Sequence, residues 1–427
     1  MGTVFRCRKS VLRGEVKIPP SKSHTIRAIA VASLAAGDSV VLNPLDSADT
    51  RSAVRVYRGL GAEISMGPDG WYVRGREGEP KVPEEVLDVG NSGTTLMFAL
   101  GTCALLREGA AVLTGDAQTR NRPADPLLSS LNDLGAIAFS TRGNGRAPFV
   151  VQGRIRGGTT SLEAHSSQYL SSLLLSVPLG DGDAIIRVPL LNEEPYVWMT
   201  LDWMRRQGIR WEQQGMEEFR IPGGQSYRSF RRRMPGDFSS ATFFLAAGAL
   251  EGNDIVCSGL DLDDPQGDKA VIEYLRCMGA RVEVEEDRVR VAAADLQGVD
   301  LDLNHTPDAL PMMAVLACFA RGKTRLGNVP QARIKETDRI SVMCQELRKM
   351  GARIRELPDG LLVEESQLEG ARLQGHGDHR VVMALTVAGL AAPGETEIDT
   401  AEAVAITFPQ FSHCLEQLGA DLKTMEE

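Results

Sequence analysis

The stretch Arg333–Arg339, which reads Arg-Ile-Lys-Glu-Thr-Asp-Arg, brings three cations and two carboxylates together within seven residues. The residues that follow recur at helical spacing and end at a glycine: Ile340, Met343, Leu347, Met350 and Gly351. The charged stretch is therefore predicted to lie at or just before a helix N-terminus, where free N–H groups and the helix dipole favour anions. If the helix already includes both, Lys335 and Arg339 share one face. The alternative is a solvated helix start whose charges pair with one another.

The composition limits the classes of function. A chain of 427 residues is too long for one hydrophobic core, so two or more domains are expected. A formal net charge of −10 argues against binding to nucleic acid or to an anionic membrane. The seven cysteines are scattered without a C-x-x-C pair, and no signal peptide or membrane-length apolar run is present. We therefore expect a cytoplasmic protein with reduced thiols.

A short signature, usually Leu or Met followed by Gly and Ala, closes six amphipathic segments. Its glycines are Gly61, Gly135, Gly208, Gly279, Gly351 and Gly419, at successive separations of 74, 73, 71, 72 and 68 residues. Such regularity indicates an internal repeat. In each repeat, helical segments alternate with strand-like segments such as Asp38–Leu42, which predicts an α/β protein.

Each repeat opens with a small polar cluster that precedes an alanine- and leucine-rich helix. The openings are Ser21–Ser23, Asn91–Thr95, Ser166–Gln168, Ser239–Ala241, Pro307–Ala309 and Gly377–Arg380. Helix capping explains any one of them. Six in corresponding places, several with basic residues attached, favour helix N-termini that bind shared anions. Three repeats per domain give two similar halves, with a hinge predicted near Arg231–Asp237.

Several of these motifs together resemble one family. They are Pro20–Arg27, Gly90–Thr94, Leu113–Asp116, Arg120–Pro123, Ser166–Gln168, Pro195–Tyr196, Gly236–Ala241, Pro307–Ala309, Arg333–Arg339 and Gly377–Arg380. In this order they resemble the 5-enolpyruvylshikimate-3-phosphate synthase family (3-phosphoshikimate 1-carboxyvinyltransferase).

The resemblance implies an α/β fold of two similar domains, each of three βαβαββ units around a pseudo-threefold axis, with the active site in the cleft between them. It implies that residues 1–19 join residues 236–427, that residues 20–235 form the other half, and that hinges lie near 19–21 and 233–237. It also implies transfer of the enolpyruvyl group of phosphoenolpyruvate to the 5-hydroxyl of shikimate 3-phosphate, with release of phosphate. No metal or cofactor is expected, and a monomer is.

The resemblance assigns residues to each substrate. Those for shikimate 3-phosphate are Lys22, Ser23, Arg27, Ser166, Ser167, Gln168, Tyr196, Asp308, Gln331 and Lys335. Those for phosphoenolpyruvate are Lys22, Asn91, Gly93, Arg122, Gln168, Arg339 and Arg380. Both substrates carry a phosphate and a carboxylate, which suits such a set of cations.

The reaction needs a base for the hydroxyl group and an acid for the methylene carbon. Asp308 is assigned as the base, Glu336 as the proton shuttle, and Lys22 as a stabiliser of developing charge. A structural alternative remains for each carboxylate, a helix cap for Asp308 and an ion pair with Lys335 or Arg339 for Glu336.

Four positions depart from the family pattern. Met97 and Ile406 stand where many members carry an arginine and a lysine, and Gln331 replaces a frequent asparagine. Glu193 replaces a serine that often touches the phosphate of the acceptor, and is expected to turn outward or to pair with an arginine.

Three other functions compete with this interpretation. Another enolpyruvyl transferase acting on a different phosphorylated alcohol is the first alternative. The UDP-N-acetylglucosamine enolpyruvyl transferase is disfavoured, because the loop Gly115–Pro123 lacks the cysteine usual there. A binding or scaffolding module is disfavoured by the dense set of charges at the openings.

Overall fold

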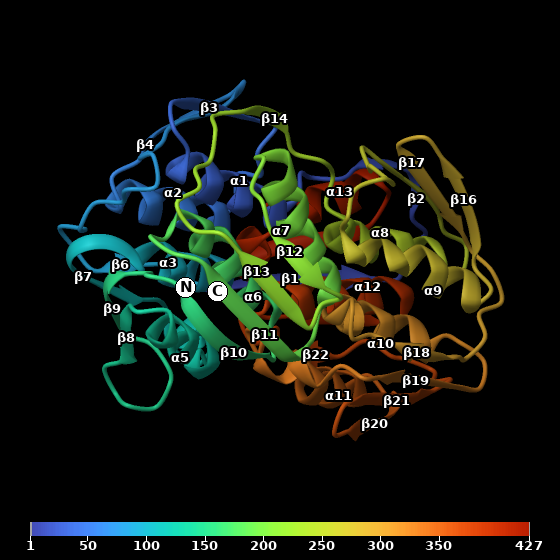
Figure 1. Cartoon of the computed structure of the whole chain (residues 1–427). Helices are drawn as coiled ribbons and strands as arrows, with labels where there is room; N and C mark the ends of the chain where they lie inside the picture. Colours follow the sequence, from blue (N-terminus) through green and yellow to red (C-terminus); the bar gives the residue numbers. More distant parts are fainter. Residues whose placement is uncertain (1, 427) are drawn as a thin grey trace. The chain divides into compact units, whose positions relative to one another are not determined.

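The computed structural model describes residues 2–426, which form two compact units (Figure 1). The N-terminal unit is Pro20–Met234. The C-terminal unit combines the residues up to Pro19 with those from Pro235 onward. The chain therefore passes from one unit to the other twice, after Pro19 and after Met234.

Each unit contains three four-stranded sheets, and all six sheets have one parallel pair followed by two antiparallel pairs. The sheets of the N-terminal unit, in spatial order, are β14 (Arg231–Arg233), β3 (Asp38–Leu42), β5 (Gly70–Arg74), β4 (Glu63–Gly67); β6 (Leu87–Asp88), β7 (Leu105–Thr114), β9 (Phe149–Arg154), β8 (Ile137–Ser140); and β10 (Gly158–Ala164), β11 (Ala184–Leu191), β13 (Glu218–Ile221), β12 (Glu212–Gln214). Those of the C-terminal unit are β2 (Arg13–Lys17), β15 (Asp254–Ser258), β17 (Arg288–Ala292), β16 (Arg281–Glu285); β18 (Asp300–Asp302), β19 (Lys323–Gly327), β21 (Gly360–Glu364), β20 (Arg353–Leu357); and β22 (Arg372–Leu373), β23 (Glu395–Ile398), β1 (Thr3–Arg8), β24 (Asp421–Glu426).

Two strands complete sheets whose other strands lie far away in the sequence. β2 pairs in parallel with β15, so the N-terminal segment supplies a strand of the C-terminal unit. β14 pairs in parallel with β3 and closes the first sheet of the N-terminal unit. Each crossing of the chain therefore follows a strand that backbone hydrogen bonds hold in its sheet.

The helices complete a repeated order of strand, helix, strand, helix and two strands. The helices of the N-terminal unit are α1 (Lys22–Leu34), α2 (Ala48–Gly59), α3 (Gly93–Cys103), α4 (Ala117–Arg120), α5 (Asp125–Asp133), α6 (Ser167–Ser176), α7 (Glu194–Arg206) and the 3-10 helix η1 (Val177–Leu179). Those of the C-terminal unit are α8 (Phe238–Gly248), α9 (Val271–Cys277), α10 (Leu310–Cys318), α11 (Arg339–Lys349), α12 (His379–Ala391), α13 (Phe411–Gln417) and the 3-10 helices η2 (Gly267–Ala270), η3 (Pro307–Ala309), η4 (Pro330–Ile334) and η5 (Ala401–Ile406). The predicted α/β class is confirmed.

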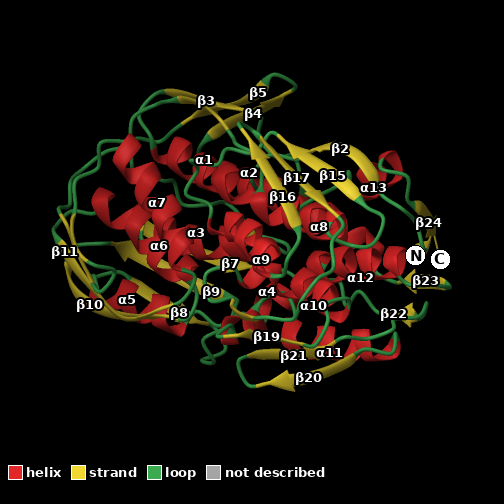
Figure 2. Cartoon of the chain, turned by 90° about the vertical axis from the view of Figure 1, so that its right-hand side faces the viewer, coloured by secondary structure: helices red, strands yellow, loops and turns green. Residues whose placement is uncertain are grey.

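The first helix of each repeat forms the core. Every residue of α3, α8 and α10 is buried, and α1, α6 and α12 are buried along almost their whole length. Helices that are apolar on all sides are stable when they are enclosed. In the C-terminal unit α8, α10 and α12 contact one another in all three pairs. The second helices are amphipathic and cover the sheets, as α11 does against β20 and β21 (Figure 2).

The six signature glycines end the second helices. Their φ angles lie between 72° and 101°, in the left-handed region that glycine adopts without strain. The predicted sixfold repeat therefore appears in the backbone itself.

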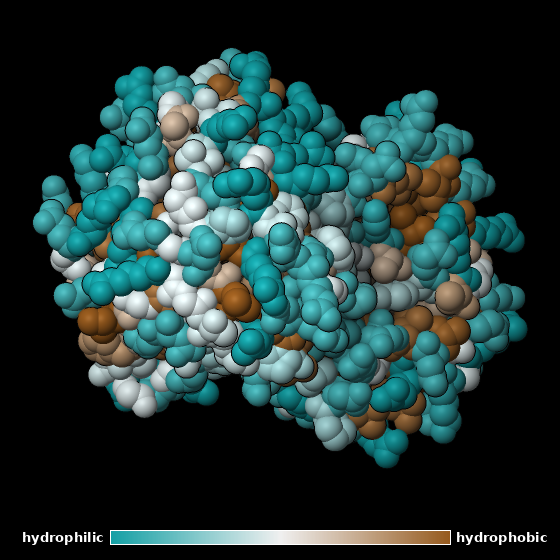
Figure 3. Space-filling view, in the orientation of Figure 1, coloured by the Kyte–Doolittle hydropathy of each residue, from teal (hydrophilic) through white to brown (hydrophobic). Residues whose placement is uncertain are grey.

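Hydrophilic residues cover most of the face shown in Figure 3. No helix within residues 2–426 is both long and apolar enough to span a bilayer. The same residues contain no cluster of three or more His, Cys, Asp or Glu side chains suited to a metal ion.

Candidate functional site

The openings of the repeats are helix N-termini, as predicted, and most carry a side-chain cap. Ser21 accepts a hydrogen bond from His24 N, Ser166 from Gln168 N and Asp378 from Arg380 N. The fourth opening differs from the prediction. The predicted cluster Ser239–Ala241 lies inside the first turn of α8, where it is buried, and the residue that caps the helix is Asp237.

Lys22 is the first residue of α1. Its ammonium nitrogen lies 3.2 Å from Oδ2 of Asp49, which belongs to the first turn of α2. The side chains of Lys22 and Asp49 are 13% and 4% exposed, so this ion pair is largely enclosed. Asp49 therefore fixes the position of the Lys22 charge.

Arg27, one turn further along α1, is buried and bonded within the protein. It donates to the carbonyls of Ser23 (3.1 Å) and Tyr196 (2.8 Å) and to Oγ1 of Thr200 (2.9 Å). Its guanidinium also lies 5.2 Å from the ring centroid of Phe98. Arg27 thus joins α1 to α7 and orders the two half-buried residues Ser23 and Tyr196.

Gly93 begins α3 against the guanidinium of Arg122. A Cβ atom at Gly93 would lie 2.6 Å from Cζ of Arg122, far inside contact distance. Beside them, Gln168 donates to Oγ1 of Thr94 (3.0 Å), which joins the N-terminus of α6 to that of α3. The structure therefore brings Gly93, Arg122 and Gln168 together in the N-terminal unit.

Asn91 precedes α3 and is held by two polar side chains. Its amide nitrogen donates to Oδ2 of Asp116 (2.6 Å) and to Oε1 of Gln118 (2.7 Å). Asp116 also caps α4 by accepting from Thr119 N. Asn91 is thereby fixed to the loop that carries Arg122.

Glu193 was expected to turn outward or to pair with an arginine, and the expectation that it turns outward is wrong. Its side chain is directed inward, the residue is 1% exposed, and Oε2 accepts from Ser167 Oγ (2.7 Å), Ser167 N (3.2 Å) and Ser166 Oγ (3.5 Å). The carboxylate thus lies at the N-terminus of α6, on two serines that sequence analysis assigns to the acceptor.

In the C-terminal unit, Arg339 gathers three carboxylates. It donates from Nη1 to Asp308 (2.7 Å), from Nε and Nη2 to Asp378 (2.8 and 3.1 Å) and from Nη2 to Glu336. The Arg339 side chain is 1% exposed. Burial alone lowers the pKa of its guanidinium, but the charges of Asp378, Glu336 and Asp308 outweigh burial and raise that pKa above its ordinary value.

Arg380 binds the other oxygen of Asp308, with Nη2 2.9 Å from Oδ2. Asp308 lies within η3 and is oriented by two guanidinium groups, so the helix-cap alternative for it is wrong. Glu336 forms an ion pair with Arg339, which was its structural alternative. The predicted catalytic carboxylates are therefore neighbours on one guanidinium.

Asp378 also stabilises this cluster. It is fully buried, caps α12 and also accepts from Thr337 Oγ1 (3.0 Å). Burial alone raises the pKa of its carboxyl, but the charge of Arg339 outweighs burial and leaves that pKa below its ordinary value. Burial lowers the pKa of the adjacent His379 to about 3, so its imidazole is neutral at physiological pH.

Lys335 and Gln331 lie on the segment before α11. Gln331 is buried and donates to the carbonyl of Asn304 (2.9 Å). Lys335 is half-buried and follows η4, whereas α11 begins at Arg339 and is capped by Asp338. The condition under which Lys335 and Arg339 would share a helix face, that the helix includes both, is therefore not met.

Two of the departures from the family pattern lie at packed positions. Met97 is 2% exposed within α3, and Ile406 is packed against the core at the end of η5. An arginine at position 97 would place a charge in an apolar helix core, which is unfavourable without a partner.

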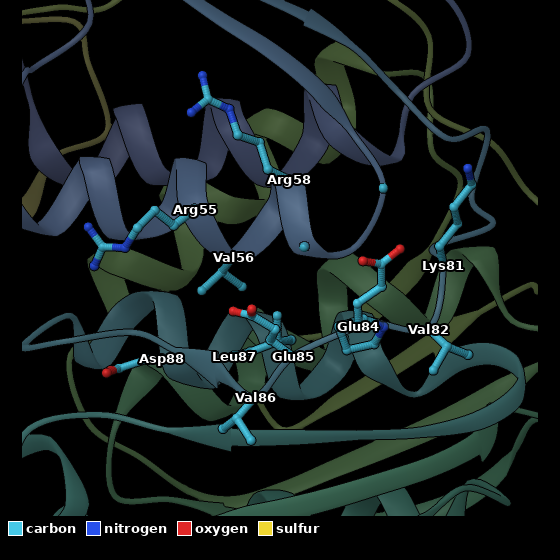
Figure 4. A pocket seen from close by; sticks show the side chains of 13 residues that line it. Arg55, Val56, Arg58, Lys81, Val82, Glu84, Glu85, Val86, Leu87 and Asp88 are labelled. Carbon is cyan, nitrogen blue, oxygen red and sulfur yellow. The ribbon is translucent and has the colours of Figure 1, made fainter.

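The pocket in Figure 4 lies elsewhere in the N-terminal unit. It has a volume of about 570 Å³ and lies between the end of α2 and residues 81–88. Among the described residues, none of those assigned to a substrate lines it. Cations such as Arg58 and Lys81 alternate there with acids such as Glu84 and Glu85, a mixture that favours no single anion.

The carboxylate partners of two predicted site cations were not predicted from the sequence. Asp49 is the partner of Lys22, and Asp378 is that of Arg339. An acidic residue in the first turn of the next helix was the available signal for Asp49. Asp378 belonged to the quoted motif Gly377–Arg380, but no role was assigned to it.

Comparisons with known proteins cover the whole chain. A family model described as EPSP synthase (3-phosphoshikimate 1-carboxyvinyltransferase) matches residues 8–415. Proteins named 3-phosphoshikimate 1-carboxyvinyltransferase are similar to it in Acetivibrio thermocellus (55% identity, 99% of this chain, 100% of the relative) and Ruminiclostridium cellulolyticum (50%, 98% and 99%). A solved structure of EPSP synthase from Acinetobacter baumannii superposes with a TM-score of 0.84 at 26% identity over the full length of both chains. The chain therefore belongs to the EPSP synthase family.

Proposed function

We propose that this protein transfers the enolpyruvyl group of phosphoenolpyruvate to the 5-hydroxyl of shikimate 3-phosphate and releases phosphate. Its family and its full-length relatives, which carry the name of this activity, support the assignment. The observation that carries the chemistry is the Arg339 cluster, in which Asp308 and Glu336 accept from one guanidinium.

In this proposal the residues that bind the acceptor are Lys22, Ser23, Arg27, Ser166, Ser167, Gln168, Tyr196, Asp308, Gln331 and Lys335. Because Arg27 donates to the carbonyls of Ser23 and Tyr196, it acts chiefly by ordering those residues. Ser167 offers both its N–H and its hydroxyl at the start of α6, where the helix dipole favours an anion.

Phosphoenolpyruvate is bound by Lys22, Asn91, Gly93, Arg122, Gln168, Arg339 and Arg380. Gly93 allows the Arg122 guanidinium to lie directly against the N-terminus of α3. Two sources of positive potential, a guanidinium and a helix N-terminus, then act on one anion. Arg339 already donates four hydrogen bonds to carboxylates, so its main effect on phosphoenolpyruvate is electrostatic.

The acid–base steps are assigned to Asp308 and Glu336. Asp308 takes the proton of the 5-hydroxyl as oxygen attacks the enol carbon, while Glu336 protonates the methylene carbon. In the second step Glu336 removes a proton from the new methyl group and phosphate leaves. Arg339 holds both carboxylates in fixed orientation, and Lys22 stabilises the charge that develops during both steps.

The same proposal includes a cytoplasmic monomer that requires no metal or cofactor. It also includes hinges near residues 19–21 and 233–237, the two places where the chain passes between the units. The cysteines support a reducing compartment, since all seven are free thiols and six are buried or nearly so.

The test is phosphate release from phosphoenolpyruvate with shikimate 3-phosphate as acceptor. Wild type should release phosphate, Lys22→Ala should lose nearly all activity while remaining folded, and the exposed Lys81→Ala should retain it. Release with a different phosphorylated alcohol alone would select another transferase. Absence of turnover and of binding to either substrate would favour a scaffold.

A further inference from the structure

The carboxylate of Glu193 occupies the N-terminus of α6. One of its oxygens, Oε2, accepts from the hydroxyl and the N–H of Ser167 at 2.7 and 3.2 Å and lies 3.5 Å from Oγ of Ser166. Glu193 and Ser167 are 1% and 2% exposed, so these are enclosed charge-assisted hydrogen bonds. An anion supplied by the protein itself therefore lies on the two serines.

The fold holds this residue in place. β10 and β11 run in parallel, with Ala164 opposite Leu191, so the loops after both strands emerge at the same edge. The pairing continues past the strand ends, since Asn192 donates from its N–H to the carbonyl of Ala164 (3.1 Å). Glu193 then adopts a left-handed conformation with φ 61°.

Glu193 stands immediately before α7, but its side chain does not cap that helix. A glutamate in the left-handed region is uncommon, and such conformations persist where the surroundings determine them. Here the side chain instead reaches across to cap α6. The backbone conformation and the hydrogen bonds of the side chain thus agree on one inward position.

We propose that the Glu193 carboxylate is a built-in competitor for the phosphate of the acceptor, which has to displace it from Ser166 and Ser167 in order to bind there. The inference rests on the proposed function, because it takes these serines to be part of the acceptor site. In this inference Glu193 lowers the affinity for the acceptor. It does so for an acceptor that carries the phosphate and much less for one that lacks it.

The competition follows from the like charges of the two anions and from the hydrogen-bond donors that both of them need. A phosphate on Ser167 needs the same N–H and hydroxyl that Glu193 uses. If both anions remained, two like charges would lie within a few ångströms in an enclosed site, which is strongly unfavourable. Removing the charge of Glu193 therefore removes an opponent of acceptor binding.

The test is calorimetric titration of the full-length protein with shikimate 3-phosphate and, separately, with shikimate. Glu193→Gln keeps the shape of the side chain and an acceptor oxygen for Ser167, and Glu193→Ser removes the occupant altogether. The matched control is Glu194→Gln, because the neighbouring carboxylate is engaged instead with Trp198, from whose Nε1 it accepts a hydrogen bond (3.0 Å). Far-UV circular dichroism checks that each variant is folded.

Both Glu193 variants should bind shikimate 3-phosphate about tenfold more tightly than wild type or more, a factor of ten being ~1.4 kcal/mol. Binding of shikimate, which lacks the phosphate, should change much less, and Glu194→Gln should resemble wild type in both titrations. An equal gain for shikimate and shikimate 3-phosphate would overturn the role of the phosphate. Unchanged or weaker binding of shikimate 3-phosphate by folded Glu193 variants would overturn the competition itself.

The failure of this inference is distinguishable from failure of the proposed function. If wild type releases phosphate from the two substrates and the Glu193 variants gain no affinity, the inference is wrong and the activity stands. If wild type and every variant fail to bind shikimate 3-phosphate and to turn over, both are wrong.

Discussion

Replacing Arg339 by methionine tests whether buried charge holds the C-terminal cluster together. Methionine fills much of the same volume but makes none of the four bonds to Asp308, Glu336 and Asp378. Three carboxylates then remain in a nearly enclosed site, where Arg380 is still paired with Asp308. Breaking a buried ion pair by removing one partner typically destabilises a protein by ~3–5 kcal/mol, which is the loss expected at neutral pH.

The loss should depend on pH with a definite sign. In wild type the pKa of Asp378 is depressed, so its contribution to stability is present above the unfolded value of about 3.9 and is lost as pH falls through the folded pKa. In Arg339→Met the unpaired carboxylates resist ionisation, so that their pKa values rise and protonation stabilises the variant. The difference in free energy of unfolding between the two proteins should therefore shrink as pH falls from 7 toward 4.

Urea unfolding followed by far-UV circular dichroism measures this difference. All four tryptophans (Trp71, Trp198, Trp203 and Trp211) belong to the N-terminal unit, so tryptophan fluorescence reports that unit separately. The control is Arg290→Met, which removes an arginine that also binds two carboxylates, Asp254 and Glu283, but is 46% exposed. Its effect should be much smaller, since exposed ion pairs contribute little. An Arg339→Met loss no larger than that of the control, or one independent of pH, would refute the reasoning.

Three further predictions follow from particular contacts. Gly93→Ala should raise KM for phosphoenolpyruvate about tenfold or more with little change in stability, because the new Cβ atom displaces the flexible end of Arg122, and steady-state kinetics against each substrate measures this. Glu346→Gln should lower stability by ~1–3 kcal/mol at neutral pH, because Glu346 is buried and accepts from Lys349 Nζ and Gln374 N. Burial alone raises the pKa of Glu346 but its donors lower it overall, so urea titrations should show this loss disappearing as pH falls below about 4. A thiol reagent should modify Cys277 rapidly and the other six cysteines after unfolding, since Cys277 is the exposed thiol and burial raises the pKa of Cys7 and of Cys318 to about 12.

Much of the architecture was predictable because its signals lie within short stretches of sequence. A glycine that must adopt positive φ after a helix marks the end of each second helix, as Gly351 does after α11. A polar residue before an apolar run marks each helix start, as Ser166 does before α6. These signals need no knowledge of distant partners, so six repeats could be read from one chain.

Distant pairing was not available from the residues in the same way. Nothing in the sequence of β14 identifies β3 as its parallel neighbour, because the N–H and C=O groups that form backbone hydrogen bonds are the same in nearly every residue. The helix start at Arg339 was placed imprecisely, although Asp338, which accepts from Ser341 N, was a recognisable cap. The inward position of Glu193 depends on a left-handed backbone and on the register of two strands. Neither can be predicted from the residue type at position 193 alone.

The cations and donors assigned to substrates share one physical arrangement that bears on how the protein selects its ligands. Asp49 lies on Lys22, Glu193 on Ser167, and Asp378 on Arg339, each in a largely buried contact. Burial explains the partners, since an enclosed charge without one is costly. Where a substrate anion takes the place of such a carboxylate, the measured affinity is the difference between two anion affinities. A phosphate that has to displace such a carboxylate therefore binds less tightly than it would to an empty site, so in our proposal Glu193 lowers the affinity for shikimate 3-phosphate more than that for shikimate.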